Sequence, residues 1–162
     1  MAIDTGIGIS LDLVSTTQQA PLGQTVLKPA GTDGAGEQVW IYVQATALLA
    51  VGDVCRRVYG AGSLAERKQA KVVQTAAAAA PHQEVAGVAQ HAIAALSYGW
   101  ILRSGVGSVK VAAATAVENG LFLNGTAIGA ADDGAGAVPG FGVALSATAG
   151  SGVVTAIINC QG

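Results

Sequence analysis

The sequence predicts an all-β fold, either a small mixed β-sandwich or a barrel, with an extended N-terminal arm and at most one short helix. Short runs rich in valine and isoleucine recur along the 162 residues, which is typical of strands. Glycine-rich turn signals separate these runs, and 23 residues are glycine. Hydrophobic residues make up 51% of the chain but aromatic residues only 4%, so the core must be built mainly from small side chains.

Residues 1–37 are expected to form the extended arm. Glycine or proline occupies eight positions between Gly6 and Gly36, a density that excludes a long helix but leaves room for short strands at Ile7–Val14. A segment of this kind usually frays or lies across a partner. The rest, residues 38–162, is expected to be a β-rich body, either undivided or made of two small β units at about 38–80 and 85–162.

The first clear strand of the body is Gln38–Ala45. Trp40 and Tyr42 share one face, and β-branched side chains share the other, so both faces are apolar. A strand of this kind is buried on both sides. Gly52 and Asp53 then predict a turn before a second run at Val54–Tyr59.

The segment Gly60–Pro81 is the one helix candidate. Ser63–Glu66 matches the capping-box pattern that starts helices, and Pro81 would end one. Val72–Thr75 is strand-like, however. Two readings therefore stay open here: a short helix, or a loop followed by a strand.

From residue 85 onward the pattern is β throughout. The expected strands lie within Val85–Ile93, Gly99–Ser104, Val106–Ala112, Leu121–Asn124, Val138–Ser146 and Val153–Cys160. Turn signals separate them at Ser104-Gly105, Gly107-Ser108, Glu118-Asn119-Gly120, Asn124-Gly125, Asp133-Gly134 and Gly150-Ser151-Gly152.

Charge is unusually sparse. The chain has 8 basic and 10 acidic residues, a formal net charge of −2, and a charged fraction of 11%. About a quarter of an ordinary soluble domain is charged, so much of this surface is expected to be covered by other subunits. The acidic balance and the lack of a Lys/Arg stripe argue against direct binding of nucleic acid. The composition therefore favours a component of an assembly.

No membrane association or export is expected. The uncharged stretches Val85–Leu102 and Gly134–Gly162 are broken by glycine, proline or polar residues, unlike a transmembrane helix. Met1–Asp4 shows neither a basic nor a long apolar region, so we expect no signal peptide.

The search for chemistry predicts neither an enzyme nor a cofactor or metal site. His82 and His91 are the two histidines, and no serine lies in a nucleophile-elbow motif. Asp132-Asp133 precedes glycine and is typical of a turn. Cys55 and Cys160 lack the close spacing of zinc or redox motifs, so both are expected to be buried free thiols.

One concentration of basic residues stands out, formed by Arg56-Arg57 and, further along, by Arg67-Lys68 and Lys71. It is either a solvated face or a surface that docks on an acidic protein.

Several runs resemble small structural proteins of tailed bacteriophages, in particular the capsid decoration (cement) proteins, loosely including that of lambda-like phages. The resemblance rests on the order of turns and small apolar strands across roughly residues 36–160. The runs are Gly36–Ala45 closed by Val51–Val54, Tyr98–Gly105, Val109–Val111, Gly120–Leu123, Gly142–Leu145 and Val153–Ile158.

The resemblance implies a β-rich homotrimer on the outer capsid surface of a virion, made in the cytoplasm of the bacterial host. It would lie at threefold or quasi-threefold positions and clamp neighbouring major capsid protein subunits. The alternatives are a head-fibre base or a carbohydrate-binding adhesion module on the virion. The candidate partner-interface residues are Ile7, Ile9, Leu11, Leu13, Trp40, Tyr42, Arg56, Arg57, Tyr98, Trp100 and Phe141.

Overall fold

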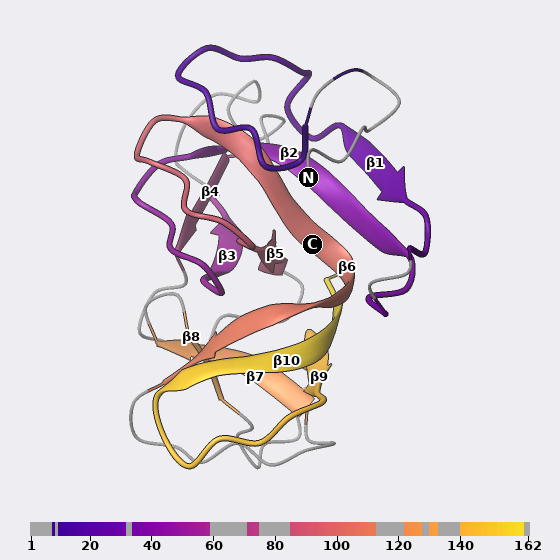
Figure 1. The fold of residues 1–162 in the computed structure, drawn as a ribbon. Helices are drawn as coiled ribbons and strands as arrows, with labels where there is room; N and C mark the ends of the chain where they lie inside the picture. Colours follow the sequence, from indigo (N-terminus) through magenta and orange to yellow (C-terminus); the bar gives the residue numbers. More distant parts are fainter. Residues whose placement is uncertain are drawn as a thin grey trace.

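The described part of the chain forms ten strands in a single hydrogen-bonded sheet (Figure 1). The computed structural model describes Gly8 and residues 10–31, 34–58, 71–74, 85–112, 122–127, 130–132 and 140–160, and these ranges contain no helix. The predicted all-β class is confirmed, with mostly antiparallel pairing and without a closed barrel. The strands are β1 (Thr25–Lys28), β2 (Gln38–Ala45), β3 (Val54–Arg57), β4 (Lys71–Gln74), β5 (Val85–Val88), β6 (Tyr98–Val111), β7 (Phe122–Ala127), β8 (Ala130–Asp132), β9 (Gly142–Ala144) and β10 (Gly152–Asn159).

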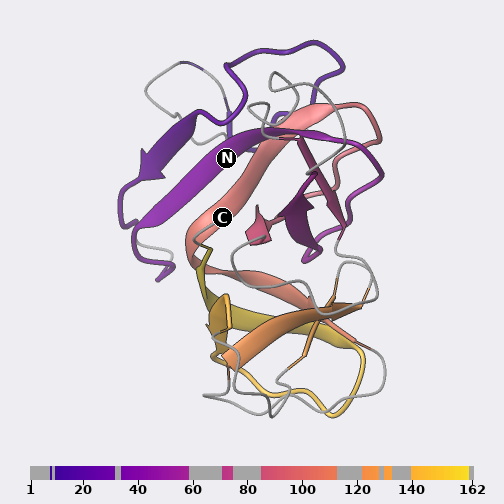
Figure 2. The ribbon, with the colours of Figure 1, turned by 180° about the vertical axis from the view of Figure 1, so that it is seen from behind.

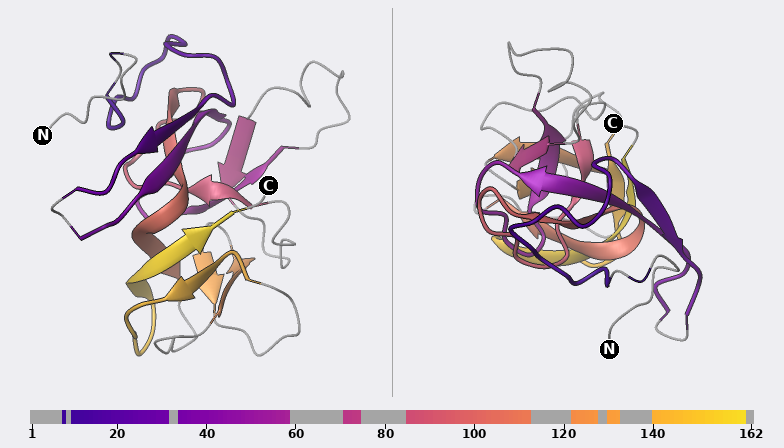
Figure 3. Two further views of the ribbon diagram at one scale, coloured as in Figure 1. Left: turned by 90° about the vertical axis from the view of Figure 1, so that its right-hand side faces the viewer. Right: turned by 90° about the horizontal axis from the view of Figure 1, so that it is seen from above.

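The long strand β6 belongs to two lobes. Its first half pairs antiparallel with β2, and its second half pairs antiparallel with the whole of β10. We call β1–β5 with the first half of β6 the upper lobe, and β7–β10 with the second half the lower lobe, after their places in Figure 1. From behind, β7 crosses the lower lobe in front of β6 and β10 (Figure 2). The views at right angles show β1 lying along β2 (Figure 3), with which it pairs antiparallel.

The strand β2 is buried on both faces, as predicted. Trp40 and Tyr42 enter a core that also takes residues from the lower lobe, such as Phe141. Ile41 and Val43 enter a second core on the opposite face, together with residues of β3, β5 and β6. The alternation of side chains along the strand thus fills two separate cores.

The predicted turn at Ser104-Gly105 is wrong, because β6 continues through it. Ser104 stays paired on both sides, opposite Val39 of β2 and opposite Asn159 of β10. Gly105 has a φ of 118°, and a Cβ there would lie 2.7 Å from the carbonyl oxygen of Glu37. Glycine here bends the strand from one lobe into the other without ending it.

Two glutamine side chains bond to the backbone of β6 just beyond this bend. Gln38 Nε2 donates a hydrogen bond to the Val106 carbonyl at 2.7 Å. Gln90 Oε1 accepts from the Ser108 amide at 2.8 Å, and its Nε2 donates to the Ser108 carbonyl at 3.0 Å. Both glutamines come from the upper lobe and hold the strand where it enters the lower lobe.

Of the other predicted turns, some lie where they are expected and others fall within strands. Gly52-Asp53 does precede β3, and a bend at residues 149–151 does precede β10. Gly107-Ser108 and Asn124-Gly125 lie within β6 and β7, so the turn predictions there are wrong. A bulge in the pairing of β7 with β8 accommodates Gly125. The turn signals at residues 118–120 and 133–134 fall outside the described residues. Asp132, also expected in a turn, is the last residue of β8.

The described part of the N-terminal 37 residues packs on the upper lobe. Leu11 is 1% exposed, and Ser15 exchanges two backbone hydrogen bonds with Tyr98. The Gln19 amide donates to the Tyr42 hydroxyl at 2.9 Å. The strand in this part is β1, further along the chain than the expected Ile7–Val14.

The helix candidate is only partly described. Its residues 71–74 form β4, which agrees with the loop-and-strand reading at this point. The rest of residues 60–81, including the capping-box match, lies outside the described residues.

Candidate interaction surface

Most of the aromatic interface candidates lie inside the molecule. Trp40, Tyr42, Trp100 and Phe141 are at most 5% exposed. The ring centroids of Tyr42 and Trp100 are 5.0 Å apart. Both belong to strands that are covered on both faces, so their rings hold the core of this chain together. Leu11, an arm candidate, is buried in the same core.

The remaining candidates are scattered. Leu13 is 42% exposed, while Tyr98 is half-buried and stacks on Tyr42 at 6.2 Å between ring centroids. Arg56 and Arg57 are half-buried at the end of β3. Ile7 and Ile9 fall outside the described residues. The structure therefore does not gather the predicted residues into one patch.

Large apolar side chains are exposed at other places, which the sequence analysis missed. Strand β10 shows why: its burial alternates along an apolar run, with Val154 and Ile158 buried but Val153 and Ile157 55% and 46% exposed. An apolar run without polar alternation does not reveal which face is covered. Among the residues whose burial the structure describes, the exposed large hydrophobic ones are Leu13, Leu27, Leu48, Val51, Leu96, Leu145, Val153 and Ile157.

Six of these eight residues lie in two regions: Leu145, Val153 and Ile157 on the lower lobe, and Leu48, Val51 and Leu96 on loops of the upper lobe. On the lower lobe, Ile157 lies opposite Val143 and Val106, so three β-branched side chains form a row on the outer face of β9, β10 and β6. On the upper lobe, Leu48 and Leu96 are carried by two loops that are hydrogen-bonded to one another. Both regions are candidates for contact with other proteins.

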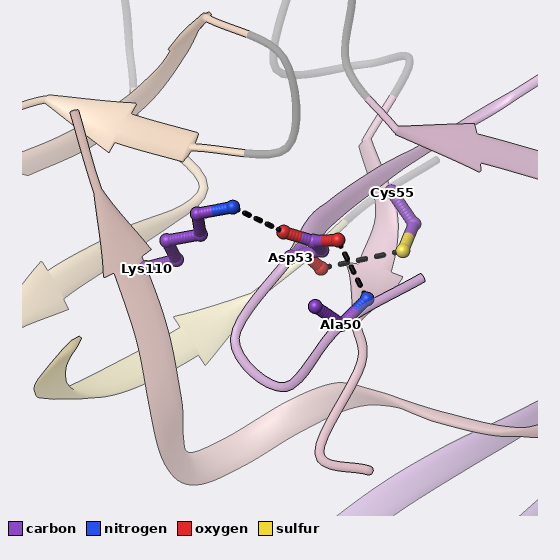
Figure 4. Close-up of polar contacts among 4 residues, drawn as sticks. All are labelled: Ala50, Asp53, Cys55 and Lys110. Atoms are coloured by element: carbon purple, nitrogen blue, oxygen red, sulfur yellow. Dashed lines mark hydrogen bonds and ion pairs between the residues drawn. The ribbon is translucent and has the colours of Figure 1, made fainter. Parts of the chain in front are cut away.

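A buried carboxylate fixes the upper lobe to the second half of β6 (Figure 4). Asp53 is fully buried, and its Oδ2 accepts a hydrogen bond from the Ala50 amide at 2.7 Å. Its Oδ1 lies 3.2 Å from Lys110 Nζ, and the Lys110 amide donates to the Gly52 carbonyl at 2.9 Å. Both carboxylate oxygens are satisfied, which makes burial of the charge tolerable.

The two cysteines are buried free thiols, as predicted. Burial raises the pKa of Cys160 to about 12. The pKa of Cys55 is raised further, first by burial and then by the charge of Asp53. The Cys55 thiol donates to the Asp53 carbonyl oxygen at 3.3 Å. Neither thiol is ionised near neutral pH, so neither has the thiolate that nucleophilic chemistry needs.

His91 is half-buried. Both of its ring nitrogens are buried without a hydrogen-bond partner among the described residues. Burial lowers the pKa of His91, and the charge of Asp12 opposes this effect. His82 lies outside the described residues.

The described residues contain no group of three or more metal-ligating side chains of the His, Cys, Asp or Glu type. No helix in the described ranges is long and apolar enough to cross a membrane.

Comparison with known proteins finds similarity among solved structures. No family model matches the chain, and no curated protein matches it significantly. Among solved structures, the chain is similar to the N base of the head fiber protein gp8.5 of bacteriophage phi29, with a TM-score of 0.53 and 15% sequence identity. The match covers 75% of this chain and 94% of that chain. At this level of identity the similarity concerns the fold.

Proposed function

We propose that this chain is a structural protein of a tailed-bacteriophage virion. In this role it binds the outer capsid surface across neighbouring major capsid protein subunits and stabilises the shell. The observation that carries the proposal is the fold shared with a phage head-fibre base, over 94% of the length of that chain. The succession of short apolar runs that resembles capsid decoration proteins supports the same reading.

The surface chemistry fits an assembly role without catalysis. Charged residues are sparse, and large apolar side chains are exposed on both lobes. A clamp across subunits works through buried area and satisfied hydrogen bonds at the seams, and needs no active site. We further propose that the protein acts as a homotrimer, as decoration proteins commonly do, and that it does not bind nucleic acid directly.

A head-fibre base is the second candidate, favoured by the identity of the structural neighbour. Such a base would attach to the capsid and carry a fibre, without stabilising the shell. A sugar-binding module receives no support from the tryptophans, because Trp40 and Trp100 are 5% and 0% exposed and offer no ring face to a sugar.

The test is binding to capsid shells assembled from the major capsid protein encoded in the same genome. Purified protein is co-sedimented with these shells, and the melting temperature of the shells is measured with and without it. Saturable binding that raises the melting temperature is expected of a decoration protein, because a ligand that binds only the intact shell stabilises it. Saturable binding without any change in melting would favour the fibre base. Absence of binding would contradict both roles.

A further inference from the structure

Two leucines project from adjoining loops of the upper lobe. Leu96 is 68% exposed and Leu48 is 61% exposed, the two highest values among the large apolar side chains of the described residues. Leu48 lies on the loop that follows β2, and Leu96 on the loop that leads into β6. We call Leu48 and Leu96 the leucine tip. In Figure 1 the two loops lie at the left side of the upper lobe.

The backbone at Leu96 is strained. Its φ is 62°, and it is the one non-glycine residue of the described part with a positive φ. For leucine this left-handed conformation is sterically unfavourable, and glycine or asparagine would adopt it more easily. Leu96 therefore combines an unfavourable backbone conformation with an unfavourable exposure of its apolar side chain to water. Features of this kind persist where the residue has a function in binding.

Hydrogen bonds within and between the two loops fix the backbone of the leucine tip. The Leu96 amide donates to the Ala45 carbonyl at 2.8 Å, and Gln44 Nε2 donates to the Leu96 carbonyl at 3.3 Å. Leu49 and Ile93, both fully buried, exchange two backbone hydrogen bonds of 2.9 and 3.0 Å between the two loops. A tip that is already ordered loses little conformational entropy when it binds.

The chemistry of the loops indicates the kind of partner. Residues 46–52 and 92–97 contain no charged side chain. A charged partner surface would lose hydration against the tip without gaining an ion pair. Two projecting aliphatic side chains fit a concave, uncharged pocket.

From these observations we infer that the leucine tip is an anchor that inserts into an uncharged apolar pocket on the outer surface of the major capsid protein. This inference rests on the proposed function, and it names the part of the molecule that makes the central contact. Burial of an exposed leucine side chain in an apolar pocket favours binding, because its apolar surface is removed from water.

The test uses three variants in the shell co-sedimentation assay: Leu96→Asn, Leu48→Ser and, as a matched control, Leu27→Ser. Leu27 is 55% exposed on β1, away from the tip loops. We expect Leu96→Asn and Leu48→Ser each to weaken shell binding by about tenfold or more. Leu27→Ser should bind like the wild type.

Stability measurements separate binding from folding. Because asparagine tolerates the left-handed conformation, Leu96→Asn is expected to raise the melting temperature of the free protein by about 2–4 °C while it weakens binding. Leu48→Ser should leave the melting temperature unchanged. A lower melting temperature for Leu96→Asn would mean that Leu96 supports the loop, and would overturn the inference.

The remaining outcomes distinguish the two proposals. If the wild type binds shells and both tip variants bind equally well, the inference is wrong and the proposed function stands. If the wild type does not bind shells, the proposed function itself fails, and the inference with it. If the tip variants instead change the solution mass of the free protein, the occupant of the tip is a second copy, which also overturns the inference.

Discussion

At the scale of single residues, the stability of the fold depends on pH through His91. Its two ring nitrogens are buried without a hydrogen-bond partner in the described part of the chain, and burial lowers the pKa of His91 from the ordinary value of 6.5, against the smaller opposing effect of Asp12. The unfolded chain therefore takes up the proton at a higher pH than the folded chain. The neutral ring is the form that the fold accommodates, so its stabilising contribution is fully present above pH 6.5.

Acidification is accordingly expected to destabilise the protein through His91. As the pH falls below 6.5, the unfolded state binds the proton first, and the stability is lost progressively down to the lower pKa of the folded state. Melting temperatures are measured at pH 7.5 and pH 5.5 for the wild type and for His91→Gln, which does not titrate in this range. The wild type should lose more stability between the two pH values. Equal losses would show that His91 does not contribute.

At the scale of secondary-structure elements, the bend of β6 depends on Gly105. A side chain there would combine a φ of 118° with close approach to the backbone of Glu37 and the side chain of Gln38. The backbone of Glu37 cannot move without disturbing the adjoining start of β2, so the contact is not easily relieved.

Replacement of Gly105 by alanine is therefore expected to cost about 2–3 kcal/mol of unfolding free energy. The melting temperature should fall by roughly 4–12 °C. Gly150→Ala is the matched control, because a Cβ at Gly150 meets nothing within 4 Å and its φ is not positive. Thermal unfolding of the two variants checks this prediction. A Gly105→Ala protein as stable as the Gly150→Ala protein would contradict it.

The strands that the sequence predicts best are those whose signal is local. Strand β2 has the expected bounds, Gln38–Ala45, because both faces are marked by β-branched and aromatic residues. The sequence does not reveal that β6 continues through its glycines. A glycine inside a strand has the same local signal as a glycine in a turn, and only the pairing partners on both sides distinguish the two. Strand β1 was missed for a related reason: Thr25–Lys28 is extended because it pairs with β2, a contact that its own residues do not encode.

The candidate surface was harder to predict than the fold. Aromatic residues such as Trp100 are enriched both in cores and at interfaces, so residue type alone could not decide between the two. Leu96 could not be identified because neither its exposure nor its positive φ follows from the local sequence Ala95-Leu96-Ser97. Both properties arise from the long-range hydrogen bonds that fix the loop.

At the scale of the whole molecule, one core connects the lobes. The cluster that contains Trp40 and Trp100 of the upper lobe also contains Phe141 and Val154 of the lower lobe. The buried Asp53 with its Lys110 partner adds a polar connection between the lobes. The second core lies wholly within the upper lobe, whereas the large buried apolar residues described for the lower lobe all belong to the shared cluster. We therefore expect the lower lobe to unfold together with the upper lobe.

The proposed homotrimer is a whole-molecule property that the mass in solution tests directly. The sparse charge and the exposed apolar side chains of the lower lobe, Leu145, Val153 and Ile157, favour self-association. Light scattering behind a sizing column should give a species near three times the 15.9 kDa of one chain. A mass of one chain would contradict a trimer in free solution and would restrict assembly to the capsid surface.

The single strand shared by both lobes also has a mechanical consequence. A pull on the loop that carries Leu96 is transmitted along β6 into its eight-residue pairing with β10. Such a load acts along the strands, so the hydrogen bonds of this pairing resist it together in shear instead of opening one after another. If the protein is anchored near the start of β6, the covalent backbone of this strand carries tension from the upper lobe into the lower lobe, and the hydrogen bonds with β10 resist it there.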